Sequence, residues 1–338
     1  MSIAVAPLPR PRGPLTEMLL DRLAGAPEPL PAVAVEDDPL SGEDLHLALY
    51  LCYELHYRDL AGVDPRWEWE PSLIGFRGGL ESAFEAALEA DVGPVSWGAG
   101  DEMGARLRAM VAGDDGPSLA RHVARAATAD EVRELVVHRS GYQLKEADPQ
   151  SFAIPRLQGR PKAALVEVQF DEYGAGRPER IHAELYAEVM RGLGLDGGYG
   201  AYLDLLPGVT LATVNTVSLF SLHRRRRGAS VGHLALTEMT SSEANRRYAN
   251  GLRRLGFDGA VLDFFDEHVE ADAVHEAVAV HDMAGALAAE EPALAADVLF
   301  GALALLSAER RFAEHVLGAW AAGRSSLRAR LELPVPSR

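Results

Sequence analysis

Apolar residues recur at helical spacing through most of this chain, and no stretch shows the sustained apolar–polar alternation of a half-buried strand. A clear example is SGEDLHLALYLCYELHYRDL, which starts at the N-cap residue Ser41 and carries Glu43 and Asp44 in its first turn. Gly, Pro and Asp residues separate this stretch from further helical ones. The sequence therefore predicts an all-α fold.

Further helices are expected on both sides of Pro149, over residues 78–92, 99–112, 117–126, 128–147, 161–173, 178–193, 208–224, 228–239, 241–255, 260–289 and 291–320. Gly174 and Pro178 suit the end of one helix and the first turn of the next. We therefore expect Glu172 to close a helix and Glu179 to open the following one.

The 338 residues suffice for one large or two ordinary domains. Residues 1–40 are rich in Pro and Ala and lack a lasting apolar period, which indicates a flexible arm. We expect an N-terminal helical lobe over 41–125, a helical domain with the functional site over 126–322, and a C-terminal tail over 323–338. The lobe over 41–125 shows no recognisable chemistry, and it either covers the active-site bundle or forms a homodimer contact.

Charge and hydropathy exclude several kinds of partner. The formal charge of −17 opposes binding to nucleic acid or anionic lipid, and the run Arg224–Arg227 is too short to reverse it. The N-terminal apolar stretch is broken by prolines, and the apolar run at Leu299–Leu306 is shorter than the roughly 20 residues that span a bilayer. We expect a cytoplasmic protein without nucleic-acid or membrane partners.

A single cysteine, Cys52, limits the metal chemistry that is open to the chain. It excludes an intramolecular disulfide and any site built from several thiolates. No P-loop, dinucleotide-binding glycine turn or Gly-x-Ser-x-Gly elbow occurs. A metal site would therefore consist of histidines and carboxylates.

The segment FFDEHVEADAVHEAVA carries the most informative spacing. His268, Asp272 and His275 stand at i, i+4 and i+7, which places them within an arc of about 60° on one helix face. Apolar neighbours indicate that this face is buried, where two imidazoles and a carboxylate are costly without a balancing charge. A bound cation would supply that balance.

A second helix repeats part of this pattern. Glu179 and His182 form a carboxylate-x-x-His pair, as do Asp272 and His275. Two such pairs, with one glutamate from each of two further helices, make up the ligand set of helical di-iron sites. Glu146 and Glu172 are available as the single glutamates, and hard oxygen ligands with imidazoles suit iron.

The order of these residues differs from that of ferritin-like bundles, because Glu172 lies only seven residues before Glu179 and His268 is an additional histidine. The series resembles the ligands of the heme-oxygenase-like di-iron oxidases and oxygenases. The segments YQLKEADPQSFAIPRLQGRPKAALVEVQFDEYG, RIHAELYAEVM, LFSLHRRRRGASVGHLALTEMTSS and DEHVEADAVHE are similar to an actinobacterial branch of iron-containing redox enzymes. The resemblance covers about residues 125–305.

This resemblance implies a heme-oxygenase-like bundle over 126–322 that holds two irons, with Glu179 as the candidate bridging carboxylate. The implied ligands are Glu146, Glu172, Glu179, His182, His268, Asp272 and His275. It further implies O₂-dependent oxidation of a small organic substrate such as an amino acid or amine, by N-oxygenation, desaturation or C–C cleavage. Electrons would come from an external reductase or a ferredoxin-type donor.

Two other functions fit parts of the pattern. An iron-storage or metal-handling protein would use the same ligands without organic chemistry. A metal-free hydrolase similar to thiaminase II would need a nucleophilic cysteine in the core, but Cys52 lies outside the ligand region.

Several other polar residues also suggest a metal site. We expect structural or surface roles for Glu54 with His56 and for Glu134 with His138, because neither pair has complementary ligands nearby. Glu238, in the polar stretch of GHLALTEMTSS, is a candidate for an additional ligand or supporting carboxylate.

Overall fold

A computed structural model describes residues 5–32 and 34–332, and of residues 270–274 the backbone alone. Over these residues the fold is all-α, as predicted, and no strand occurs besides two isolated bridges. The helices are α1 Pro14–Leu23, α2 Glu43–Glu54, α3 Pro71–Val92, α4 Met103–Gly113, α5 Leu119–Arg125, α6 Ala129–Gln143, α7 Asp148–Ser151, α8 Gly159–Glu172, α9 His182–Gly192, α10 Gly208–Leu222, α11 Arg227–Arg254, α12 Ala260–Ala277, α13 Ala286–Glu290 and α14 Ala295–Ala321.

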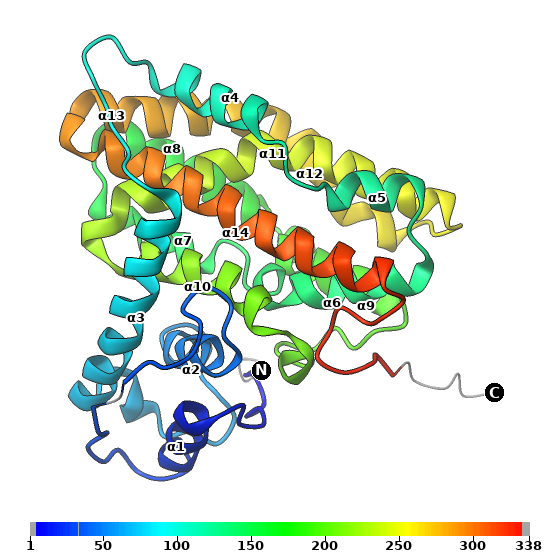
Figure 1. The fold of residues 1–338 in the computed structure, drawn as a ribbon. Helices are drawn as coiled ribbons and strands as arrows, with labels where there is room; N and C mark the ends of the chain where they lie inside the picture. The colour runs from blue at the N-terminus through cyan, green and yellow to red at the C-terminus, as the bar shows by residue number, and fades with distance from the viewer. Residues whose placement is uncertain (1–4, 33, 333–338) are drawn as a thin grey trace.

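The long helix α11 forms the centre of the bundle, where it packs against α14, α12 and α5 (Figure 1). Two glycines permit the close crossing of α11 and α14. A Cβ atom at Gly232 would lie 1.8 Å from the Val298 carbonyl oxygen, and one at Gly301 would lie 2.0 Å from that of Ala229. Because no side chain fits at either position, the crossing requires glycine on both helices.

Some helix boundaries differ from the prediction. Residues 228–239 and 241–255 belong to the single helix α11, and the helix expected from residue 178 begins at His182. The expected helix 260–289 consists of α12, a π-helical segment at Val278–Gly285, and α13. Such π segments are rare and frequently occur near functional sites.

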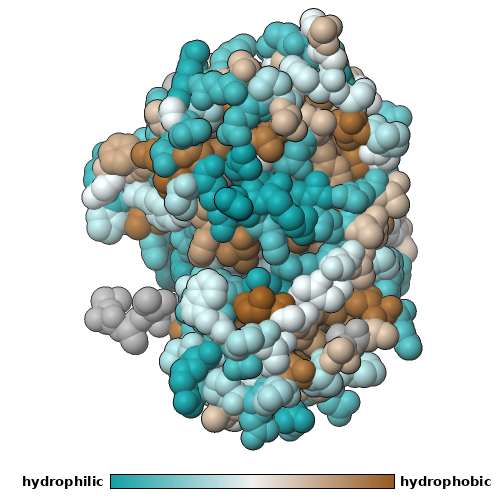
Figure 2. Space-filling model, turned by 90° about the vertical axis from the view of Figure 1, so that its left-hand side faces the viewer, coloured by the Kyte–Doolittle hydropathy of each residue, from teal (hydrophilic) through white to brown (hydrophobic). Residues whose placement is uncertain are grey.

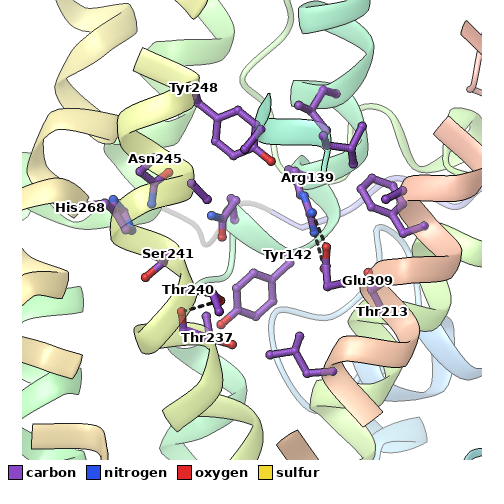
Figure 3. Close-up of a pocket in the computed structure, with 18 of the residues that line it drawn as sticks. Arg139, Tyr142, Thr213, Thr237, Thr240, Ser241, Asn245, Tyr248, His268 and Glu309 are labelled. Carbon is purple, nitrogen blue, oxygen red and sulfur yellow. Dashed lines mark hydrogen bonds and ion pairs between the residues drawn. The ribbon is translucent and has the colours of Figure 1, made fainter. Parts of the chain in front are cut away.

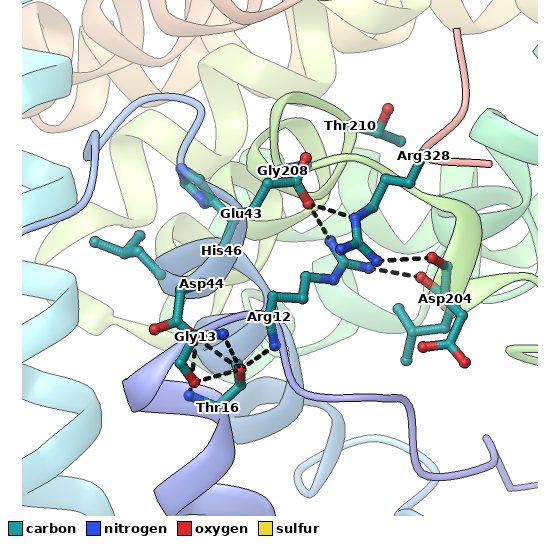
Figure 4. A network of polar contacts seen from close by, with 12 residues as sticks. Arg12, Gly13, Thr16, Glu43, Asp44, His46, Asp204, Gly208, Thr210 and Arg328 are labelled. Carbon is teal, nitrogen blue, oxygen red and sulfur yellow. Dashed lines mark hydrogen bonds and ion pairs between the residues drawn. The ribbon is translucent and has the colours of Figure 1, made fainter. Parts of the chain in front are cut away.

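The prediction of a flexible arm over residues 1–40 is wrong for residues 14–23. These residues form α1, whose Leu15, Leu19 and Leu23 are buried. The carboxylate of Asp44 accepts hydrogen bonds from the backbone N–H groups of Leu15 (2.8 Å) and Thr16 (2.9 Å) (Figure 4). It therefore binds free N–H groups at the start of α1. This contact comes from a distant residue and cannot be seen in the local sequence.

The predicted boundary between residues 125 and 126 is not visible as a break in packing. One cluster of buried side chains extends from the N-terminal helices into α9, α10, α11 and α14. Helix α2 packs against α10, and α5 packs against α11. The division into lobes therefore stays a prediction, and the two parts share one core. Of the predicted C-terminal tail, residues 333–338 lie outside the described part.

The run Arg224–Arg227 lies after α10, and its last residue begins α11. The guanidinium groups of Arg225, Arg226 and Arg227 pair with acidic residues, such as Arg225 with Glu85 and Arg226 with Asp297 (3.0 Å). The positive charge of this run is thus balanced within the fold.

One helical stretch in the described residues, Pro292–Ala321, is long and apolar enough to match a membrane span by length and composition. Because its main part, α14, packs against α11 and α10 in the bundle, this stretch has the properties of a core helix. The face of the molecule in Figure 2 shows mostly hydrophilic side chains with separated hydrophobic groups.

Burial of His46 makes the stability of the fold depend on pH. This fully buried imidazole contacts the Pro39 carbonyl oxygen through Nε2 (3.1 Å) and the Asn215 amide nitrogen through Nδ1 (3.2 Å). An amide N–H that donates to Nδ1 requires the neutral imidazole. Burial, as the largest cause, lowers the pKa of His46 from 6.5 to about 4.

We expect the free energy of unfolding to decrease as the pH falls from 6.5 to 4, because over this range the unfolded chain binds a proton at His46 and the folded protein does not. The contribution is on the order of 3 kcal/mol. Denaturant unfolding at several pH values measures it, and the His46→Gln variant should show a weaker pH dependence. Parallel curves for the two proteins would contradict this assignment.

Candidate metal centre

Five segments bring acidic and histidine side chains to one buried place in the bundle. Glu146 comes from the turn between α6 and α7, Glu172 ends α8, and His182 begins α9. Glu238 comes from the middle of α11, and α12 contributes His268 and His275. All of these side chains are buried except that of Glu146, which is 13% exposed.

The chain between Glu172 and His182 forms an excursion that returns to its starting point. Tyr173 and Ile181 form an antiparallel bridge at its base. Gly174 has φ +72°, and a Cβ atom there would lie 2.7 Å from the Arg180 carbonyl carbon, so this position requires glycine. As a result, His182 Nδ1 lies 2.6 Å from Glu172 Oε2 although nine residues intervene.

Two groups of possible ligand atoms result. The first consists of Glu146, Glu172, His182 and His268, whose ligand atoms all lie within 4.8 Å of one another. The second consists of Glu172, Glu238 and His275 within the same limit. The two groups share Glu172, which has one oxygen near His182 and the other 4.0 Å from His275 Nδ1.

Neighbouring acceptors orient two of the imidazoles. His268 Nδ1 lies 2.8 Å from the Phe264 carbonyl oxygen, so this nitrogen donates and Nε2 faces Glu146 at 3.7 Å. His275 Nε2 lies 3.0 Å from Asp171 Oδ2, so its Nδ1 faces Glu238 at 3.5 Å. Metal-bound histidines are held in the same way, with one ring nitrogen donating to an acceptor and the other available to the metal.

The electrostatics of the second group show that it needs positive charge. Burial opposes the charged form of His275, but the carboxylates of Glu238 and Asp171 outweigh it and raise the imidazole's pKa to about 9. Burial also raises the pKa of Glu238, with His275 acting against this and Glu172 adding to it. Without a metal ion, a proton on His275 thus balances the carboxylates. A bound cation would replace this proton.

These observations fit a metal ion well. Carboxylate oxygens and imidazole nitrogens are a donor set for iron or manganese. Buried carboxylates so close together repel each other unless a cation compensates them. The Oε2 atom of Glu146 is buried and accepts no hydrogen bond from any described residue, which leaves it available as a ligand.

The structure brings most of the predicted ligands together, but not all of them. Glu146, Glu172, His182, His268 and His275 come together in the two groups. Glu179 lies exposed on the short 3₁₀ turn Pro178–Arg180 of the excursion and belongs to neither group. The side chain of Asp272 lies outside the described residues, so its role as a ligand stays a prediction.

Glu238, a candidate from the sequence, adds a carboxylate to the second group beside Glu172 and His275. The polar stretch around Glu238 on α11 is the signal in the sequence that points to it. Among the other polar pairs, Glu54, Glu134 and His138 lie outside both groups. His138 contacts the hydroxyls of Thr210 and Ser326 at 2.7 Å and 3.0 Å.

A cavity of about 540 Å³ adjoins both groups and is lined there by Glu146, Glu172 and His268 of the first and by Glu238 of the second. Figure 3 shows His268 on one side of this cavity and the ion pair of Arg139 with Glu309 on the other. The two side chains of the pair are joined by two hydrogen bonds of 2.7 Å and 2.6 Å.

Polar residues along one face of α11 form a wall of this cavity. Thr237, Ser241 and Asn245 are four residues apart and thus project from the same side of the helix (Figure 3). The Thr237 hydroxyl donates to the His233 carbonyl oxygen at 3.0 Å, so its own oxygen can accept a hydrogen bond from a ligand. Valine, leucine and phenylalanine side chains form much of the remaining surface.

A family model described as iron-containing redox enzyme matches residues 133–310, which is more than half of the chain. The chain belongs to the iron-containing redox enzyme family. The match confirms the resemblance to the heme-oxygenase-like superfamily and includes both groups of candidate ligands. No curated protein matches this chain significantly. The family supports a redox function with iron.

The two positions Glu172 and Glu179 allow a direct test of the metal centre. We expect Glu172→Ala to lose most bound Fe(II), because this carboxylate belongs to both groups. Glu179→Ala should retain the iron content of the wild type, because Glu179 is exposed and belongs to neither. Iron analysis after anaerobic loading measures both. Equal loss in the two variants would contradict the geometry.

Proposed function

We propose that this iron-containing redox enzyme is a non-haem di-iron oxidase or oxygenase that acts on a small organic substrate. The observation that carries this proposal is the pair of ligand groups with a shared carboxylate, Glu172. A carboxylate with two oxygens can bridge two ions, and helical di-iron sites are built from such glutamates and histidines.

Each group would hold one iron. Glu146, His182 and His268 would hold one ion, Glu238 and His275 would hold the other, and Glu172 would contribute to both, because it belongs to both groups. Asp272 is proposed as a further ligand, because it lies on α12 between His268 and His275 at helical spacing. In this assignment Glu172, rather than Glu179, would be the carboxylate shared by the two ions.

Bound iron would supply redox chemistry with O₂. The chain's own residues perform the other tasks. Asp171 holds the proton of His275 at Nε2, and the Phe264 carbonyl oxygen holds that of His268 at Nδ1. The cavity binds the substrate beside Glu172 and His268, and its apolar surface reduces the access of water.

The cavity supports a small organic substrate with a polar group. Its volume of about 540 Å³ is within the range typical of small-molecule sites. The hydroxyls of α11 and the pair of Arg139 with Glu309 offer both acceptors and charge. An amino acid or amine would use such groups, and the proposed outcome is N-oxygenation, desaturation or C–C cleavage.

Electrons for this reaction would come from a separate reductase or ferredoxin-type protein. The chain has one cysteine, Cys52, which is buried, so it holds no thiolate cluster of its own. We also propose that the protein acts in the cytoplasm without nucleic-acid or membrane partners, in line with its net charge of −17.

The test is anaerobic loading with Fe(II), followed by mixing with O₂ and a panel of amino acids, amines and fatty acids. We expect two irons per chain and a transient visible absorption whose decay depends on one class of substrate. His275→Ala should bind about one iron. Iron well below two per chain in the wild type would refute the di-iron proposal. Oxidation of Fe(II) that no organic compound affects would favour an iron-storage or metal-handling protein instead.

A cavity-filling variant tests where the substrate binds. Ser241→Trp places a large side chain into the cavity and should raise KM about tenfold or more while the iron content stays unchanged. Arg246→Trp is the matched control, because Arg246 is exposed on the same helix and does not line the cavity. Steady-state kinetics with the active substrate compare the two, and an unchanged KM in Ser241→Trp would place the substrate elsewhere.

A further inference from the structure

Glu146 lies in a turn that no regular helix supports. Helix α6 ends at Gln143 and α7 begins at Asp148, so residues 144–147 lie between them. Ala147 has a left-handed backbone with φ +71°. The position of a carboxylate in such a turn depends on what holds the neighbouring residues.

Lys145, next to Glu146, is held by a buried ion pair with the N-terminal part of the chain. Its side chain is 1% exposed, and Nζ lies 2.7 Å from Oε2 of Glu54, whose side chain is fully buried. The other carboxylate oxygen of Glu54 accepts a hydrogen bond from the Tyr199 hydroxyl. The ammonium group also lies over the ring of Tyr50, at 4.3 Å from its centroid.

Three further contacts hold the same turn. Arg58, four residues after α2, pairs with Asp148 at 3.2 Å, and Tyr173 donates a hydrogen bond to the same carboxylate at 3.0 Å. The Ala147 carbonyl oxygen accepts a hydrogen bond of 2.7 Å from the Gln169 side chain. Residues on both sides of Glu146 are thus tied to neighbouring elements.

We propose that the end of α2 positions the metal ligand Glu146 through the Lys145–Glu54 pair, so that both are positioning residues of the metal centre. This inference rests on the proposed function. An ion pair without access to water tolerates little displacement, because a shift of either partner leaves a buried charge uncompensated. The backbone of Lys145 and Glu146 is therefore restrained in one place. This gives a role to the N-terminal lobe, which shows no chemistry of its own.

The test compares two double variants of α2. Glu54→Gln with Lys145→Met removes the pair at the end of the helix without leaving a buried charge. Arg12→Met with Glu43→Gln is the control and removes an ion pair at the start of the helix, with a separation of 2.9 Å, in which Arg12 is buried and Glu43 is 42% exposed (Figure 4). The two glutamates lie eleven positions apart, which is about 16 Å along the helix. Thermal unfolding and circular dichroism establish that each variant folds.

We expect the Glu54/Lys145 variant to bind one of the two Fe(II) ions about tenfold more weakly, whereas the Arg12/Glu43 variant binds both as the wild type does. In the metal-free protein, the backbone amides of residues 144–148 should exchange with deuterium faster in the first variant only. If the double variant does not fold, Tyr199→Phe removes the phenol that donates to Glu54 and should shift both measurements in the same direction by less.

Unchanged Fe(II) binding and unchanged exchange in the Glu54/Lys145 variant would overturn the inference, as would equal changes in both double variants. Its failure differs from a failure of the proposed function. Wild-type protein that binds no Fe(II) would refute the di-iron proposal, and the metal-free exchange measurement would still show whether the pair restrains the turn.

Discussion

The burial of several carboxylates at one place is the constraint on which the rest of the structure depends. Glu172 and Glu238 lie in the core beside the partly buried Glu146, and such groups can remain charged only where positive charge is close. Each histidine of the centre therefore faces a carboxylate. In His268 and His275 the second ring nitrogen is directed to an acceptor, the Phe264 carbonyl oxygen and the Asp171 carboxylate respectively. The surrounding helices are arranged to keep this set together.

The helix crossings bring the ligands together from distant parts of the sequence. Gly232 and Gly301 let α11 and α14 approach until their backbones are in contact, and α12 also packs against α11. This arrangement directs Glu238 toward His275 and leaves the cavity between α11, α14 and α6. Packing, rather than any local motif, thus decides which residues meet in the candidate metal centre and which line the adjoining cavity.

The N-terminal helices contribute to this packing too, although they lie outside the region that the family model matches. The matched region begins at residue 133 and includes Lys145 but not its partner Glu54. Asp44 supports α1, and Glu43 and Glu54 hold the two ends of α2. The first part of the chain thus shares one hydrophobic core with the helices that carry the candidate metal centre. Its removal would therefore disturb the packing of those helices.

The sequence by itself determined the all-α fold, because apolar periodicity is a local property, and it singled out His268 and His275, because a helix places residues seven apart on one face. It also singled out Glu172 and His182, but not how they meet. Only the tertiary structure decided that Glu179 lies exposed on an excursion, that Glu238 faces His275, and that α1 is docked on Asp44. These outcomes depend on contacts between residues far apart in the chain, and no local spacing encodes them.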